Sequence, residues 1–121
     1  MIAKIIDCAK RVHLNFGPGY VDRVYENALL HELQCAKIPA QAQQGIQVPY
    51  DGVPVGQFVA DILVDSRIMV EIEASQVLQD LHLAQGLNYL KATGLDTCLV
   101  LNFGAPELEI RPLVRTSGFC S

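Results

Sequence analysis

Three acidic residues lie in two consecutive apolar segments, and their spacing indicates metal chemistry. Asp61 ends the segment GQFVAD, and Glu71 and Glu73 lie in MVEIEA. Both segments are expected to be neighbouring β-strands, where burial of a carboxylate is unfavourable unless a cation compensates it. Oxygen ligands without His or Cys suit Mg²⁺ or Mn²⁺. The sequence therefore predicts a metal site, with the alternative that one or more acids lies on a solvated sheet edge.

The turn between the two strands decides whether the acids share a face. Directly opposed residues of neighbouring strands point to the same side of the sheet. A two-residue loop at 65–66 would place Asp61 opposite Val70, whereas a three-residue loop at 65–67 would place it opposite Glu71. We predict the three-residue loop, because it lets one cation compensate all the acids.

In that register Val59 would lie opposite Glu73, and all three carboxylates would share one face. The expected metal ligands are Asp61, Glu71 and the backbone carbonyl of Ile72.

The next predicted helix carries a polar stripe, with His82, Gln85 and Tyr89 at positions i, i+3 and i+7. Such a stripe could orient a water, a phosphate or a metal-bound group. The alternative is that Tyr89 packs in the core and Gln85 caps a strand end. Lys91 lies well round the helix from Gln85 and is expected to be solvated.

Two further acids, Asp22 and Glu26, lie at i and i+4 of an earlier predicted helix. Both could point towards the site. Asp22 is equally well placed to stabilise the N-terminus of its helix, and we favour that interpretation.

Composition places limits on the partners. The chain has 121 residues, a formal charge of −4, 50% hydrophobic and 18% charged residues. Its nine basic residues are scattered, which argues against a protein that coats DNA through phosphate contacts. The high apolar content suggests a homodimer, with a tightly packed monomer as the alternative.

The four cysteines form no CxxC pair and no zinc-site spacing. We expect reduced thiols in a cytoplasmic protein, with Cys8, Cys35 and Cys98 as small buried hydrophobic residues. No apolar run approaches the length of a membrane span, so no membrane association is expected.

Periodicity predicts the order α-α-β-β-β-α-β-β in a single α/β (α+β) domain over residues 1–121, with a central mixed sheet flanked by helices. After an N-terminal helical segment, the predicted helices are 21–35 and 77–92. The predicted strands start at about 44, 57, 68, 97 and 108 and end at 50, 64, 73, 102 and 114. Asp51-Gly52 marks a hairpin turn, and Gly94 ends the last helix.

Together these segments resemble the GxxExxY protein family, a branch of the PD-(D/E)xK nuclease superfamily. The resemblance runs from FGPGYVDRVYENALLHEL through VADILV and VEIEA to HLAQGLNYLKATG and LVLNFG. It implies an α-β-β-β-α-β core and a metal-dependent phosphodiesterase site. The implied motif positions are Asp61, Glu71, Glu73, Gln85 and Tyr89, of which the last two resemble the QxxxY motif of RecB-type exonucleases.

Two positions depart from the family pattern. Asp22 replaces the glutamate of the name motif and is one methylene shorter. Glu73 replaces the lysine of the (D/E)xK motif, which would hold the attacking water and stabilise charge on the phosphate. Glutamate cannot stabilise that charge, although it could act as a base or a metal ligand.

Three functions follow as hypotheses. The first is a Mg²⁺- or Mn²⁺-dependent nuclease that cleaves DNA or RNA, with Gln85 and Tyr89 positioning the substrate. The second is a nuclease-fold domain without catalysis that binds nucleic acid or a protein partner, which Glu73 and the acidic charge favour. The third is a dimerising structural domain, which only the apolar content suggests.

Overall fold

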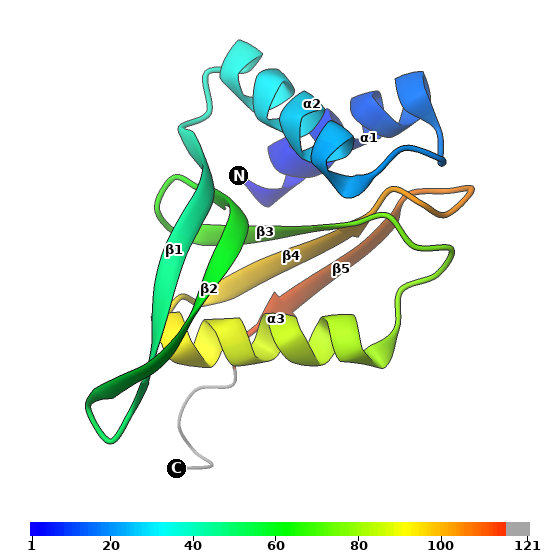
Figure 1. Cartoon of the computed structure of the whole chain (residues 1–121). Helices are drawn as coiled ribbons and strands as arrows, with labels where there is room; N and C mark the ends of the chain where they lie inside the picture. The colour runs from blue at the N-terminus through cyan, green and yellow to red at the C-terminus, as the bar shows by residue number, and fades with distance from the viewer. Residues whose placement is uncertain (116–121) are drawn as a thin grey trace.

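A five-stranded sheet separates two helical layers (Figure 1). The computed structural model describes residues 1–115. Its helices are α1 (Ile2–Phe16), α2 (Asp22–Cys35) and α3 (Asp80–Thr93). Its strands are β1 (Ala40–Tyr50), β2 (Val53–Val64), β3 (Ile68–Glu73), β4 (Thr97–Asn102) and β5 (Glu109–Val114). Helices α1 and α2 cover one face of the sheet, and α3 covers the other (Figure 1).

The strands lie in the order β1-β2-β3-β4-β5. All neighbours are antiparallel except β3 and β4, which are parallel and are connected through α3. The predicted order of elements and the mixed α/β class are confirmed. The Asp51-Gly52 turn is also confirmed, and β2 starts directly after it at Val53, because the hairpin pairs down to Tyr50 and Val53. Helix α3 starts three residues later than predicted.

Two apolar clusters hold the layers together. The larger one lies under α1 and α2 and includes Ile5, Leu29, Tyr25 and Phe103, with the last two rings stacked at 4.9 Å between centroids. The smaller one lies between α3 and the sheet, around Leu90. A side chain at Gly86 would meet the Leu113 Cδ1 atom at 2.6 Å, so this glycine lets α3 lie close to the sheet.

The hairpin β1–β2 bends where the two layers meet. Gln43 takes a φ of 56°, and it falls opposite Asp61 at a step of the ladder where no pair forms. On one side of this step Ile62 packs under α1 and α2, and on the other side Ala60 and Phe58 pack against α3. Asp61 therefore lies at the point where β2 passes between the layers.

The cysteine predictions hold in part. Cys8 and Cys98 are buried and free, as expected, but Cys35 is exposed at the end of α2. Its thiol faces His31 one helical turn earlier, at 3.5 Å from Nε2, on the outer side of the helix. Cys120 lies outside the described residues. Within residues 1–115, no helix has both the length and the apolar composition needed to span a bilayer.

Candidate active site

The β2–β3 turn brings Asp61 and Glu71 together. The ladder pairs Val64 with Ile68 and Ile62 with Val70, which leaves a three-residue loop and puts Asp61 opposite Glu71. Within this loop, residues 65 and 66 both have positive φ and the residue 67 amide donates to the residue 64 carbonyl at 3.0 Å, so a tight turn closes the loop. The predicted three-residue loop is confirmed.

The pairing of β2 with β3 ends at this point. The predicted pairing of Val59 with Glu73 is wrong, because β2 bends away beyond Ile62. The Ile72 amide therefore donates to the Asp61 carboxylate, at 2.8 Å from Oδ2. This hydrogen bond holds the Asp61 side chain at the part of β3 that no longer pairs with β2, next to Glu71.

Asp61 and Glu71 form a strained electrostatic pair. Burial, together with the charge of Asp61, raises the pKa of Glu71 to about 9. Burial also raises the pKa of Asp61, against the hydrogen bonds from the Ile72 amide and from Glu71. The Oε1 atom of Glu71 is buried and has no hydrogen-bond partner among the described residues. In the absence of a cation, the pair is arranged to share one proton.

Glu26 of α2 reaches the same place from the opposite helical layer. It is 4% exposed, and both its carboxylate oxygens accept hydrogen bonds from Gln43 Nε2, at 2.8 and 2.9 Å. Burial raises its pKa, and the nearby charge of Asp61 adds to this rise. The positive φ of Gln43 directs its side-chain amide towards Glu26. The two hydrogen bonds hold the Glu26 carboxylate beside Asp61. The i, i+4 spacing from Asp22 was the only sequence signal for Glu26.

Glu73 and His82 connect β3 to α3. His82 Nε2 lies 3.4 Å from Glu73 Oε1. The other ring nitrogen, Nδ1, accepts the Gln79 amide at 3.2 Å as part of a capping box at the start of α3. Because Nδ1 accepts, the hydrogen of the neutral ring lies on Nε2, the nitrogen that faces Glu73. Burial raises the pKa of Glu73, whereas His82 lowers it and the charge of Asp22 raises it.

The remaining predicted residues occupy different environments. Tyr89 is half-buried and stacks on Phe58, with ring centroids 3.8 Å apart. Burial and the charges of Glu71, Asp61 and Glu73 raise the pKa of its hydroxyl, so Tyr89 lies at the edge of the acid group. Gln85 is exposed on α3, as is Lys91. The structure thus brings Tyr89 and His82 to the acids and leaves Gln85 at the surface of α3.

A buried network around Asn102 supports the segment after β3. Asn102 is fully buried, and its Oδ1 accepts the amides of Ser75 and Gly104 at 2.9 and 3.1 Å. Its Nδ2 donates to Glu109 at 2.7 Å. Glu109 also accepts a hydrogen bond from the Leu78 amide. The hydrogen bond from Asn102, and to a smaller extent that from Leu78, lowers the pKa of Glu109. The connection from β3 to α3 is therefore held in place at two of its backbone amides.

The donor set fits a hard divalent cation. Among residues 1–115, no three His, Cys, Asp or Glu side chains converge closely enough to coordinate one ion. Mg²⁺, however, is commonly held by one or two carboxylates and keeps several waters. Asp61 and Glu71 supply two carboxylates. Because Oε1 of Glu71 accepts no hydrogen bond from the described residues, an ion could bind it without breaking one. The residues present therefore suit such an ion.

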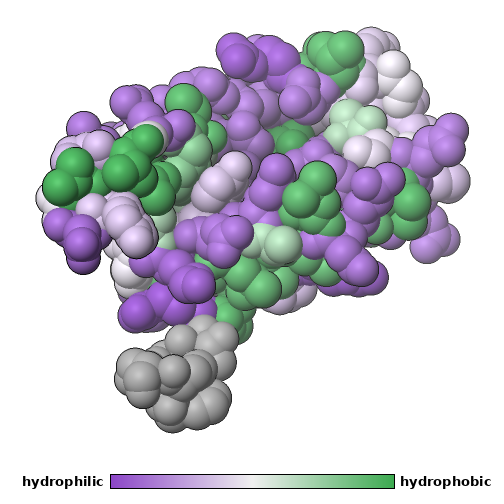
Figure 2. Space-filling model, turned by 60° about the horizontal axis from the view of Figure 1, so that its bottom comes forward, coloured by the Kyte–Doolittle hydropathy of each residue, from purple (hydrophilic) through white to green (hydrophobic). Residues whose placement is uncertain are grey.

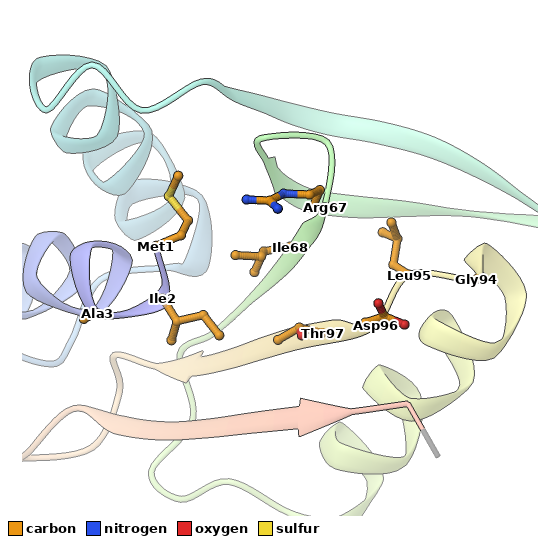
Figure 3. A pocket seen from close by; sticks show the side chains of 9 residues that line it. All are labelled: Met1, Ile2, Ala3, Arg67, Ile68, Gly94, Leu95, Asp96 and Thr97. Atoms are coloured by element: carbon orange, nitrogen blue, oxygen red, sulfur yellow. The ribbon is translucent and has the colours of Figure 1, made fainter. Parts of the chain in front are cut away.

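A cavity of about 590 Å³ lies at the start of β3, away from the acids near its end, and is lined by nine residues (Figure 3). It includes Ile68 at the start of β3, and Arg67 and Asp96 are its charged side chains. Arg67 pairs with Asp65 at 3.0 Å. The cavity shares no residue with the acid group, so its size alone gives it no catalytic meaning.

The comparison with known families agrees with this geometry. Residues 1–113 match the family model described as the PD-(D/E)XK nuclease superfamily. The chain belongs to the PD-(D/E)XK nuclease superfamily. Members of this superfamily typically use divalent metal ions and act on nucleic acids. Neither a curated protein nor a solved structure matches the chain significantly.

Proposed function

We propose that the chain is a Mg²⁺- or Mn²⁺-dependent nuclease that hydrolyses phosphodiester bonds of DNA or RNA. The observation that carries the proposal is the Asp61–Glu71 pair, in which a buried Glu71 oxygen lacks a donor. A divalent cation would replace the proton that the pair otherwise holds. The superfamily membership supports this assignment of the pair.

In this proposal Asp61, Glu71 and the carbonyl of Ile72 hold the ion. The N–H and C=O of one strand residue point to the same side of the strand. Because the Ile72 amide points to Asp61, its carbonyl is expected on that side too. The chemistry that such an ion supplies is activation of water and neutralisation of phosphate charge.

Glu73 is proposed as the general base, or as a further ligand. His82 would hold one Glu73 oxygen by its Nε2–H and leave the other free for the attacking water. Gln85 and Tyr89 are proposed to position the substrate: Gln85 is accessible on α3, and Tyr89 presents its hydroxyl near the acids.

The experiment compares cleavage of DNA and RNA, with and without Mg²⁺ or Mn²⁺, by the natural chain and by Glu71→Gln. We expect loss of at least about a hundredfold in the variant, because the charge that holds the ion is removed. Glu107→Gln, an exposed glutamate away from the site, is the matched control and should cleave normally. Cleavage that survives in Glu71→Gln would rule out this pair as its source.

A second candidate function is a nuclease-fold domain without catalysis that binds nucleic acid or a protein. Glu73 in place of the motif lysine favours it, because Asp22 and Glu73 make the site still more negative. Glu73→Lys separates the two. A chain that lacks only the lysine should gain cleavage, whereas an enzyme adapted to Glu73 should lose it.

Three accompanying assignments are also proposals. We place the chain in the GxxExxY branch, as one domain over residues 1–121. Its free thiols Cys8, Cys35 and Cys98 support a cytoplasmic location.

We also propose a homodimer. Its support is the uncharged edge strand β1 and the apolar surface over the projecting β1–β2 hairpin, which includes Val53 and Val55 (Figure 2). The molar mass in solution tests this assignment, and a monomer at micromolar concentration would remove it.

A further inference from the structure

A groove beside the acid group has the features of a base-binding site. It has a volume of about 390 Å³ and lies between the α1–α2 connection and the segment that follows β3, with one wall formed by residues 19–22 and the other by residues 73–75. These segments lie on the same side of the molecule (Figure 1). Glu73 lines the groove and also belongs to the acid group, so the two sites are continuous.

Both walls are held in place by buried side chains. On one wall, the Tyr25 hydroxyl donates to the Gly17 carbonyl at 2.6 Å and accepts the Tyr20 amide at 3.1 Å. On the other wall, Asn102 accepts the Ser75 amide at 2.9 Å. A ligand would therefore find the groove already formed, without the entropic cost of ordering either segment.

Tyr20 lines the groove and forms an exposed aromatic pair with Phe16. Tyr20 is 51% exposed and Phe16 is 42% exposed, and their ring centroids lie 5.2 Å apart. Tyr25 supports both rings from beneath, at 6.2 and 6.3 Å between centroids. An exposed, supported aromatic surface next to a phosphodiester site is the usual platform on which unpaired bases stack.

The charge of the groove selects the part of a nucleotide that enters. Asp22 and Glu73 line it, and both would repel a phosphate. The same carboxylates can accept hydrogen bonds from the amino groups of bases. The phosphate would then remain at the proposed cation site, and the neighbouring base would enter the groove.

The geometry points to this groove as the binding site of an unpaired, amino-bearing nucleobase of single-stranded DNA or RNA, adjacent to the scissile phosphate. The inference rests on the proposed function, because it takes its scissile phosphate from that site. It names single strands, or frayed ends, as the substrate class, because a paired base cannot leave its stack without loss of pairing. With a net charge of −4 and scattered basic residues, base stacking rather than phosphate contacts would supply the affinity, so binding should depend only weakly on salt.

The test measures fluorescence anisotropy of labelled oligonucleotides on the Glu71→Gln background, which should not consume the probe. Single-stranded DNA, single-stranded RNA and a blunt duplex of equal length are compared. Tyr20→Ala should weaken single-strand binding about tenfold or more, and Tyr20→Phe should retain it. Tyr20→Leu, which keeps apolar bulk without a ring, should behave as the alanine variant does. Tyr50→Ala, which removes an exposed tyrosine at the tip of the β1–β2 hairpin, is the matched control.

Three results would overturn the inference: no binding of single strands, tighter binding of the duplex, or equal affinities for Tyr20→Ala and Tyr50→Ala. Oligo(dC) should bind more tightly than oligo(dT), because thymine lacks an exocyclic amino group. Equal binding of the two would overturn the part assigned to Asp22 and Glu73.

The two proposals fail in different ways. Cleavage that is insensitive to Glu71→Gln removes the proposed active site, but leaves a Tyr20-dependent binding result intact. If cleavage depends on Glu71 but its rate and KM are the same in Tyr20→Ala, the proposed base-binding groove is wrong. The proposed nuclease site then still stands.

Discussion

Two groups of buried polar side chains lie along the same sheet and are compensated in opposite ways. Around Asn102, both side-chain atoms have partners, and hydrogen bonds lower the pKa of Glu109. Around Glu71, one buried oxygen has no partner, and burial raises the pKa to about 9. The fold supplies donors where a polar group serves the structure. At Asp61 and Glu71 it supplies too few, and a proton or a cation must complete the site.

The largest expected effect comes from disrupting the hydrogen-bonded group around Asn102. Asn102→Ala removes the acceptor of the Ser75 and Gly104 amides and the donor to Glu109. We expect the free energy of unfolding to fall by about 3 kcal/mol or more, measured by chemical denaturation. Asn88→Ala, at an exposed position of α3, is the control and should change little. An equal small effect of both would mean that water replaces the Asn102 hydrogen bonds.

Removal of the charge of Glu71, whose buried oxygen has no partner, should instead raise the free energy of unfolding. The folded pKa of Glu71 lies above its ordinary value of 4.5, at about 9, so between these values the folded chain binds more protons than the unfolded chain. Stability therefore falls as pH rises through this range in a chelator. Glu71→Gln should match the natural chain near pH 5 and exceed it by roughly 2–4 kcal/mol near pH 8–9. Denaturation at several pH values checks this, and parallel pH profiles of the two chains would contradict it.

A divalent cation should compensate the charges of Asp61 and Glu71, as hydrogen bonds already compensate the polar groups around Asn102. At about a hundred times its dissociation constant, Mg²⁺ or Mn²⁺ should stabilise the natural chain by about 2.7 kcal/mol, or several degrees in Tm. The gain should be larger at pH 8 than at pH 6, because the ion competes with the proton on Glu71. Thermal melts of Glu71→Ala should show no such shift, whereas Glu109→Gln should keep it. A shift of equal size in Glu71→Ala would place the ion elsewhere.

The sequence predicted the features that depend on local pattern. An apolar run broken only by two acids indicated β3. The register that puts Asp61 opposite Glu71 was predicted because one cation could then compensate the acids, and the structure has that register. The sequence indicated that Glu26 could point towards the site, but not which residues would hold it there. That contact depends on the bend at Gln43, whose positive φ has no signature in the polar run around it.

The Asn102–Glu109 contact was missed for a related reason. It joins two strands that are each predictable, but a sequence does not show which of their polar residues is buried. Cys35 was placed wrongly because an apolar neighbourhood along the chain does not determine which side of a helix faces water.

The smallest effect concerns His82, which belongs to the structure and to the candidate site at once. His82→Ala removes the acceptor for the Gln79 amide and should cost about 1 kcal/mol of stability. His82→Gln should restore most of that stability, because glutamine at this position completes a capping box. If His82 also positions Glu73, cleavage should fall about tenfold in both variants, since neither holds the Glu73 carboxylate as the ring does. Full cleavage by His82→Gln would show that the residue serves only the helix, and that Glu73 takes its position without it.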